Sequence, residues 1–301
     1  MNAEIPLNYT FFFEAIGCNW EVVTIEPLEK TLEWKILERI EQFEKVYSRF
    51  RVDSLISKVA NASFGGIFEF PEDSLELFNL YDQLHRLTLG AIDPLIGLDL
   101  ELLGYDRKYS LQPASDKVRA KAHILGRPNW SKDVIRKKQS LVTKRPFVID
   151  IGAVGKGYLV DIISSMLLQV GHNDFVIDGS GDILHLGHTG TMIGLEHPFN
   201  PEIVIGVVNI KNKSLCASAV NRRSWGNGYH HVFDGRTGIP VKDIVATWVI
   251  ADTTAIADGL ATALFFVSGD ILTKDFDFSF VRMFSDGCVE ISKNFEGDIF
   301  T

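Results

Sequence analysis

The spacing of apolar and polar residues changes period several times along the first hundred residues, which predicts strands mixed with helices. Residues 11–25 are rich in aromatic and β-branched side chains and predict a strand that folds into a hairpin at Gly17. Over residues 28–47 apolar residues recur every three to four positions, as on one face of a helix. A second amphipathic helix is expected over residues 71–89, with Pro71 in its first turn.

The rest of the chain shows the same mixture without a regular strand–helix alternation. Apolar runs predict strands at four places: 175–184 with a glycine turn inside it, 203–210, 245–250 and a final hairpin over 278–291. A helix is expected over 255–267, and the basic stretch 105–145 is expected to form helix and loop on the outside. This order favours an α+β fold with mixed or antiparallel sheets flanked by helices over a doubly wound sheet. No linker or repeat divides residues 1–301, so we expect one domain, built as a single unit or as two lobes.

Composition excludes several classes of protein. The chain has 301 residues, of which 46% are apolar and 23% charged, as is ordinary for a soluble globular protein. Its net charge of −9 argues against nonspecific binding to the nucleic-acid backbone. The three cysteines lie far apart, which predicts neither a disulfide framework nor a zinc site. No run is long enough to span a membrane, and the N-terminus lacks a basic signal region, so a cytoplasmic location is expected.

One stretch, IDIGAVGKGYLVD (149–161), combines features of an anion site. An apolar run ends at Asp150, three glycines surround Lys156, and an amphipathic helical pattern follows. A strand end, a glycine turn and a helix start place unpaired N–H groups and the helix dipole toward a bound phosphate. A purely structural strand-to-helix turn explains the stretch, taken alone, equally well.

A second candidate lies on the predicted helix 255–267. Asp258 and Thr262 are four residues apart, so a carboxylate and a hydroxyl share one face of the helix. The other positions are apolar, which predicts that Asp258 is buried and needs a partner, for which a hard cation is suitable. The alternative is a bond from a nearby N–H group or lysine.

Three further segments carry polar groups beside turns. Arginines in YSRFR (47–51) suit phosphate binding by their fork geometry, although a solvated helix end explains them as well. In TLGAID (88–93), Asp93 precedes a proline and is held extended, which would expose the peptide groups of Ala91 and Ile92 to a flat heterocycle; an ordinary helix exit is the alternative. In YHHVFDGRTGIP (229–240), neighbouring histidines face opposite sides of a strand, so at most one faces a pocket.

Six segments, in this order along residues 12–269, resemble motifs of the ApbE family, the FAD:protein FMN transferases. The matching pairs are YSRFRVDSLIS with "fSrF…SelS", TLGAIDPLIG with "tgGafDptvg", IDIGAVGKGYLVD with "iDlggiaKGyavD", IDGSGDI with "nlGGdi", YHHVFDGRTGIP with "ysHIiDPrTGyP", and ADTTAIADGLATALFFVSG with "aDalaTalfvlG". Each glycine motif is weak by itself, but six in order are specific.

The resemblance implies a site residue by residue. It implies an Mg²⁺ ion held by the Ala153 carbonyl and by the side chains of Asp258 and Thr262, which agrees with the oxygen ligands expected for a hard cation. The positions implied to contact the flavin nucleotide are Ser48, Ala91, Ile92, Asp93, Asp150, Lys156 and the loop near Asp182. The histidine of "HIiDP" falls on His231 rather than His230.

The implied reaction is Mg²⁺-dependent phosphoryl transfer from FAD. A Ser or Thr hydroxyl of an acceptor flavoprotein attacks the phosphorus on the riboflavin side, AMP leaves, and His231 is the candidate base. Two alternatives use the same segments: an Mg²⁺-dependent FAD pyrophosphohydrolase that yields FMN and AMP, and an FAD-binding protein without turnover. No acceptor-like segment is seen in the chain itself, so self-flavinylation is not expected.

The chain departs from the family pattern in two segments. Gly235 stands where the family usually has proline, which predicts a looser turn. The segment CASAVNRR has Ala217, Ala219 and Asn221 where the family reads approximately "TSGdYRR".

Overall fold

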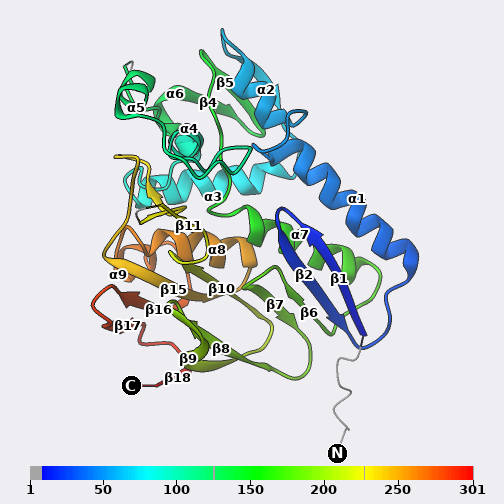
Figure 1. Ribbon diagram of the computed structural model, residues 1–301. Helices are drawn as coiled ribbons and strands as arrows, with labels where there is room; N and C mark the ends of the chain where they lie inside the picture. The colour runs from blue at the N-terminus through cyan, green and yellow to red at the C-terminus, as the bar shows by residue number, and fades with distance from the viewer. Residues whose placement is uncertain (1–8, 125, 227, 301) are drawn as a thin grey trace, which may run out of the picture.

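The computed structural model, which describes residues 9–124, 126–226 and 228–300, is built on an eight-stranded sheet (Figure 1). In order across the sheet the strands are β1 (Tyr9–Ala15), β2 (Cys18–Thr24), β6 (Phe175–Asp178), β7 (Asp182–Leu186), β10 (Lys213–Ala219), β15 (Ile244–Ala251), β16 (Ser279–Phe284) and β17 (Val289–Ile291). Every neighbouring pair is antiparallel. The predicted α+β class is therefore confirmed, as are the hairpin at Gly17 and the C-terminal hairpin.

The central strands of this sheet are buried on both faces. Successive side chains point to opposite sides of the sheet, and both sets lie in apolar clusters. On β15, Trp248 packs into one apolar cluster and Val249 into another. Leu215 and Cys216 divide in the same way on the neighbouring β10. One face is covered by helices, and the other by a small sheet of β8 (Thr191–His197), β9 (Asn200–Ile210) and β18 (Gly297–Ile299).

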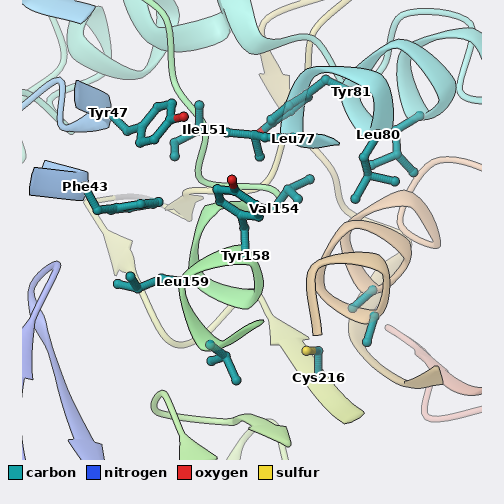
Figure 2. Packing of buried hydrophobic residues seen from close by; sticks show 14 of the residues in the cluster. Phe43, Tyr47, Leu77, Leu80, Tyr81, Ile151, Val154, Tyr158, Leu159 and Cys216 are labelled. Atoms are coloured by element: carbon teal, nitrogen blue, oxygen red, sulfur yellow. The ribbon is translucent and has the colours of Figure 1, made fainter. Parts of the chain in front are cut away.

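Two helices, α7 (Gly155–Gln169) and α8 (Thr254–Ala263), lie against the large sheet, and α1 (Lys30–Tyr47) and α3 (Ser74–Leu87) pack on them (Figure 1). Figure 2 shows Phe43 of α1 and Leu77 of α3 around Tyr158 and Leu159 of α7. All four side chains are buried. No helix within the described residues is long and apolar enough to cross a membrane. The remaining helices are short: α2 (Leu55–Asn61), a 3₁₀ turn (Pro94–Ile96), α4 (Gly97–Leu102), α5 (Asp116–Ala122), α6 (Trp130–Asp133) and α9 (Gly269–Leu272).

The prediction for residues 105–145 is wrong in its second half. Besides α5 and α6, this stretch contains β4 (Val134–Lys137) and β5 (Ser140–Thr143), which form a sheet with β3 (Gly66–Glu69). In β5, Leu141 is fully buried, whereas the second half of β4 consists of half-buried Arg136 and exposed Lys137. Strands of four residues leave too little alternation to be recognised among lysines and arginines.

The apolar run before Asp150 is also not a strand. Residues 146–150 have no regular structure, and the Asp150 N–H donates to the Pro94 carbonyl at 2.8 Å. The predicted helix follows, but α7 begins at Gly155, so two of the three glycines lie in its first turn and not in a turn before it. The segment 224–240 forms two minimal hairpins, from β11 (Ser224–Trp225) with β12 (Tyr229–His230) and β13 (Phe233–Asp234) with β14 (Ile239–Pro240).

Candidate metal and nucleotide site

The N-terminal ends of α7 and α8 touch through a glycine. A Cβ atom on Gly157 would lie 2.2 Å from the Thr254 carbonyl oxygen, so only glycine permits this approach. The Gly157 N–H donates to Oδ2 of Asp258 at 2.9 Å. In return, the Asp161 carboxylate accepts hydrogen bonds from the N–H groups of Thr254, at 2.9 Å, and Ala255, at 2.8 Å. Each helix thus supplies a carboxylate to the first turn of the other, which fixes the position of Asp258.

The predicted metal ligands are brought together beside this contact. Thr262 lies one turn after Asp258, and its Oγ1 is 3.5 Å from the Ala153 carbonyl oxygen. Burial raises the pKa of Asp258 well above its ordinary value, the Asp182 carboxylate raises it further, and the Lys156 ammonium opposes them. The N–H partner that the alternative explanation required exists in Gly157, but it occupies Oδ2 alone. A buried carboxylate, a hydroxyl and a carbonyl are the donor set of a hard cation, so these residues fit Mg²⁺.

An ion pair between half-buried Lys156 and buried Asp182 lies next to the proposed ligands. The Lys156 Nζ is 3.3 Å from Oδ2 of Asp182 and donates to the Ser180 carbonyl at 2.9 Å. Burial opposes the charge of Lys156, but the carboxylates of Asp182 and Asp258 raise its pKa above the ordinary value. Burial raises the pKa of Asp182, and Lys156 counteracts this effect. Lys156 is therefore a cation, and it faces two carboxylates at the start of α7.

Asp150, at the start of the glycine turn, is held by two hydrogen bonds. Its Oδ2 accepts a hydrogen bond from Nε of Arg49 at 2.5 Å, and its Oδ1 accepts one from the Gly152 N–H at 2.7 Å. The Arg49 guanidinium also donates to the Tyr105 carbonyl and lies over the Phe50 ring, 4.2 Å from its centroid. Arg49 is thus bound to a carboxylate rather than presented to a phosphate.

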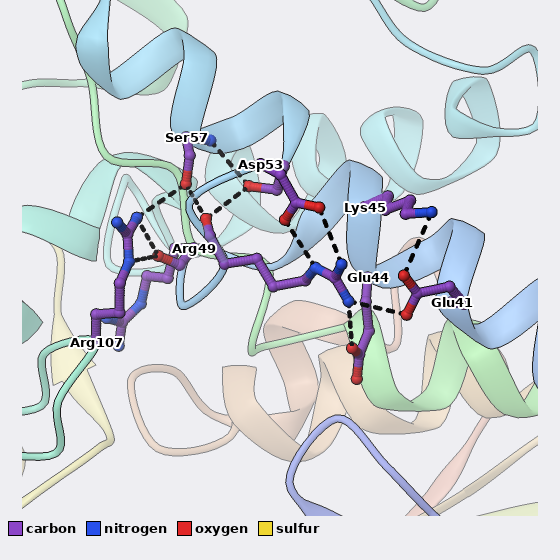
Figure 3. A network of polar contacts seen from close by, with 9 residues as sticks. Glu41, Glu44, Lys45, Arg49, Asp53, Ser57 and Arg107 are labelled. Carbon is purple, nitrogen blue, oxygen red and sulfur yellow. Dashed lines mark hydrogen bonds and ion pairs between the residues drawn. The ribbon is translucent and has the colours of Figure 1, made fainter.

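Arg51 is occupied in the same way. Its guanidinium pairs with Asp53, Glu41 and Glu44, three carboxylates that Figure 3 shows close together at the C-terminal end of α1. Its Nη1 is 2.8 Å from Glu41 and its Nε is 3.0 Å from Asp53. The phosphate hypothesis is not favoured for Arg51, whose ion pairs lie at the end of the helix as the alternative expected. Arg49 is not at a solvated helix end, because it is buried, and its Nη2 has no hydrogen-bond partner within the described residues. Ser48, which caps the C-terminal end of α1, is half-buried, and its N–H donates to the Glu44 carbonyl at 3.0 Å.

The peptide groups of residues 91 and 92 have partners inside the protein. The Ala91 N–H donates to the Thr88 carbonyl, and the Ala91 carbonyl accepts from the Gly235 N–H at 2.8 Å. The Ile92 N–H donates to Oγ1 of Thr88 at 3.0 Å. Both residues are buried, so the expectation that this turn exposes free peptide groups to a heterocycle does not hold for these three groups.

Asp93 is extended as predicted, with φ −137° and ψ 117°. Its carboxylate accepts hydrogen bonds from the N–H groups of Leu95, at 2.8 Å, and Trp130, at 2.9 Å. His85 Nε2 lies 3.3 Å from the same carboxylate. The side chain is buried, and these contacts tie three separate segments together.

Gly235 does not loosen its turn. Its N–H donates to the Ala91 carbonyl, a bond that proline lacks the proton to make. A Cβ atom at this position would lie 2.8 Å from Cβ of Asp93 and 2.8 Å from the Gly90 carbonyl oxygen. Here glycine allows the turn that follows His231 to pack tightly against residues 90–93, which corrects the expectation from the sequence.

The two neighbouring histidines differ in their surroundings. His230 is buried; its Nε2 lies 2.9 Å from the Val241 carbonyl, and its Nδ1 accepts from the Val232 N–H. His231 has no hydrogen-bond partner for its buried Nδ1 within the described part of the chain. Burial, the Arg223 guanidinium and His230 lower the pKa of His231 to about 3, while a hydrogen bond with the Arg223 backbone and the Asp150 carboxylate oppose them. His231 is therefore neutral and has a free nitrogen.

Sequence reasoning missed a role for Arg223. The residue is exposed, and its Cζ lies 6.0 Å from the centroid of the Tyr105 ring. Its charge lowers the pKa of His231 and opposes the raised pKa of Asp258, so it lies near both ends of the site. Only the pair Arg222–Arg223 beside small residues gave a signal, and that signal does not distinguish one arginine from the other.

Comparison with known proteins identifies the family and the fold of this chain. The ApbE family profile matches residues 16–273. The "FAD:protein FMN transferase" of Haemophilus influenzae is 25% identical over 237 residues, which cover 74% of this chain and 68% of that protein. The Rhodobacter capsulatus protein of the same name is 29% identical over 232 residues, 74% of this chain and 44% of that protein.

Solved structures show the same fold. The ApbE protein of Thermotoga maritima superposes with a TM-score of 0.82 at 23% identity, over 95% of this chain and 97% of that chain. The flavin transferase ApbE of Vibrio cholerae superposes with a TM-score of 0.78 at 19% identity, over 94% and 96%. These matches confirm the resemblance, the fold and the transferase class that the motifs predicted. The chain belongs to the ApbE family.

Proposed function

We propose that this protein transfers the FMN moiety of FAD to a Ser or Thr hydroxyl of an acceptor flavoprotein, with release of AMP and with dependence on Mg²⁺. The observation that carries this proposal is the pairing of two sets of groups at the meeting point of α7 and α8. The oxygens of Ala153, Asp258 and Thr262 converge on one side, and the Lys156 cation lies beside them. Cation-binding oxygens next to a fixed ammonium suit a pyrophosphate substrate.

In this proposal, Ala153, Asp258 and Thr262 hold the Mg²⁺ ion, which would neutralise charge on the pyrophosphate. Lys156, kept protonated by its neighbouring carboxylates, binds a phosphate oxygen from the side of Asp182. Such transfer depends mostly on position and charge, and both are provided by groups that hydrogen bonds hold in place.

His231 accepts the proton of the attacking hydroxyl. Its free nitrogen and its neutral state meet the first requirements of a base. A pKa near 3 is too low for efficient proton transfer at neutral pH in the ligand-free protein. An anionic pyrophosphate beside His231 raises that pKa toward the working range, since a nearby negative charge favours the imidazolium. His231 then becomes an effective base only with FAD bound.

The remaining predicted positions hold the flavin nucleotide or the loops around it. Asp150, anchored by Arg49, lies close enough to His231 to affect its pKa. We propose that Ser48 and Asp150 contact the nucleotide directly. Ala91, Ile92 and Asp93 act in this proposal mainly by shaping the loop that packs against Gly235.

Turnover of FAD tests the proposal and its two alternatives together. The protein is incubated with FAD and Mg²⁺, with and without an acceptor flavoprotein, and AMP and protein-bound flavin are measured. AMP that appears only with the acceptor supports the transferase; AMP without it, at the same rate, means a pyrophosphohydrolase. FAD binding without AMP means a binding protein, an outcome that would refute the proposal. Omission of Mg²⁺ should abolish AMP release.

A further inference from the structure

Two neighbouring arginines follow β10, and they are used differently. Nη2 of Arg222 donates to Oε2 of Glu196 at 2.9 Å. The side chain of Arg223 is exposed, and its guanidinium forms no ion pair or hydrogen bond with any residue that the structure describes. Its Cζ lies 6.0 Å from the centroid of the Tyr105 ring. Arg223 is therefore a cation without a counter-ion, and a guanidinium in that state can bind an anionic ligand.

The fold places Arg223 beside the proposed base. Ser224 of β11 pairs with His230 of β12 in an antiparallel ladder. The next positions outward along this ladder are Arg223 and His231, so these two residues lie opposite each other at the open end of the hairpin. The ring of His231 also makes a hydrogen bond with the Arg223 backbone. A group that binds next to His231 therefore lies within the surroundings of Arg223.

Tyr105 connects Arg223 to the glycine turn before α7. Cζ of Arg49 lies 4.9 Å from the centroid of the same ring, and its Nη1 donates to the Tyr105 carbonyl at 2.8 Å. Nε of Arg49 donates in turn to Asp150, at the start of the glycine turn. Trp225, two residues after Arg223, stacks on Tyr105 with ring centroids 5.7 Å apart. The hairpin and Tyr105 thus hold Arg223 at the edge of the candidate site.

The other cations at the glycine turn already have carboxylate partners. Lys156 Nζ lies 3.3 Å from Oδ2 of Asp182, and Nε of Arg49 lies 2.5 Å from Oδ2 of Asp150. A pyrophosphate brings negative charge into these surroundings, and a fixed cation beside the reacting phosphorus stabilises that charge as the reaction proceeds. Arg223 can meet this need without breaking an existing ion pair.

We propose that Arg223 is a catalytic residue that donates a hydrogen bond to a non-bridging oxygen of the FAD phosphoryl group on the riboflavin side. This inference rests on the proposed function, because that phosphorus is the one attacked by the acceptor hydroxyl beside His231. In this step the hydroxyl oxygen bonds to phosphorus and gives its proton to His231. The bond from phosphorus to the bridging oxygen breaks, and its electron pair leaves with AMP. Arg223 stabilises the charge on the phosphoryl oxygens during the transfer.

Binding of FMN and of riboflavin tests this contact without turnover, because only FMN carries the phosphoryl group. Affinities of wild type and Arg223→Gln are measured by flavin fluorescence in the presence of Mg²⁺. Arg223→Gln should weaken FMN binding about tenfold, as expected for the loss of a charged hydrogen bond, and leave riboflavin binding unchanged. Unchanged riboflavin binding also shows that the variant is folded. Equal FMN affinity in both proteins, or an equal loss for riboflavin, would overturn the inference.

Arg222→Gln is the matched control, because this neighbouring arginine is also exposed but is paired with Glu196. With FAD, Mg²⁺ and an acceptor flavoprotein, kcat for AMP release should fall about 10²-fold in Arg223→Gln and stay unchanged in Arg222→Gln. A loss of the same size in Arg222→Gln, or an unchanged kcat in Arg223→Gln, would refute the catalytic role. Failure of the proposed function would appear separately, as absence of AMP with the wild-type protein, while the comparison of FMN with riboflavin still decides the phosphate contact.

Discussion

The start of α7 and α8 and the loop 88–94 both carry predicted site residues, yet their polar groups are used in opposite ways. At the helices, Asp258 is buried with its pKa raised, and Lys156 faces two carboxylates. In the loop, the carboxylate of Asp93 accepts two backbone N–H groups and contacts His85. A buried carboxylate with a raised pKa marks a site that a ligand completes. A carboxylate whose two oxygens both accept hydrogen bonds marks a structural role.

The loop nevertheless determines where parts of the site lie. The Pro94 carbonyl accepts the Asp150 N–H, and the Ala91 carbonyl accepts the Gly235 N–H, each at 2.8 Å. The loop therefore bridges the glycine turn before α7 and the turn that carries His231. We therefore expect changes in the loop to affect activity by altering stability and the position of site residues. Changes at the start of α7 and α8 should affect the reaction itself.

Replacement of the helix carboxylate should have the largest effect. Asp258→Asn removes the charged metal ligand and should lower AMP release from FAD by about 10²–10³-fold. The free energy of unfolding should not fall, since a buried charge with a raised pKa is removed while an oxygen remains for the Gly157 N–H. AMP assays and urea denaturation measure both. Asp252→Asn, at a side chain that is 70% exposed just before the same helix, is the control. Full turnover in Asp258→Asn would refute the metal assignment.

The neighbouring histidines provide a smaller but cleaner contrast. His231→Gln should reduce flavin transfer by about 10²-fold, the contribution of a general base, and leave FAD binding unchanged. His230→Gln disturbs the contacts with Val232 and Val241 and should instead cost about 1–2 kcal/mol of stability. Steady-state transfer, FAD titration and urea denaturation separate the two. Loss of FAD binding in His231→Gln would rule out its role as a base.

Asp93→Asn tests the supporting loop. An amide cannot accept from both Leu95 and Trp130, so the free energy of unfolding should fall by about 2–4 kcal/mol. Turnover per folded molecule should change much less than in Asp258→Asn. Urea denaturation gives the first quantity, and AMP release at low temperature gives the second. Lost turnover at unchanged stability would mean that Asp93 contacts the ligand, and the contrast between the two regions would fail.

This contrast also explains which features were predictable from the sequence. The spacing of Asp258 and Thr262 is local, so their common helix face follows from helical periodicity. The partners of Asp150 and Asp93 were not predictable, because Arg49 lies 101 residues from Asp150 and Trp130 lies 37 residues from Asp93. Such pairings depend on how the sheets and helices pack, which one sequence does not reveal. Strands β4 and β5 were missed for another reason: four residues are too few to establish a period.

The smallest effect concerns pH and separates His231 from an ordinary histidine. Its folded pKa of about 3 lies below the ordinary value of 6.5, so the unfolded chain binds the extra proton as the pH falls between these values. Its contribution to stability is therefore complete above pH 6.5 and is lost as the pH falls toward 3. The profile of kcat/KM, which reports the free enzyme, should show no acid limb from His231 near pH 6.5. In Arg223→Gln one of the causes of the low pKa is removed, so an acid limb should move toward neutral pH. Profiles of kcat/KM between pH 4.5 and 8 measure this shift. Urea denaturation of wild type and His231→Gln over the same range measures the contribution of His231 to stability. Identical kcat/KM profiles in wild type and Arg223→Gln would show that Arg223 does not control the base.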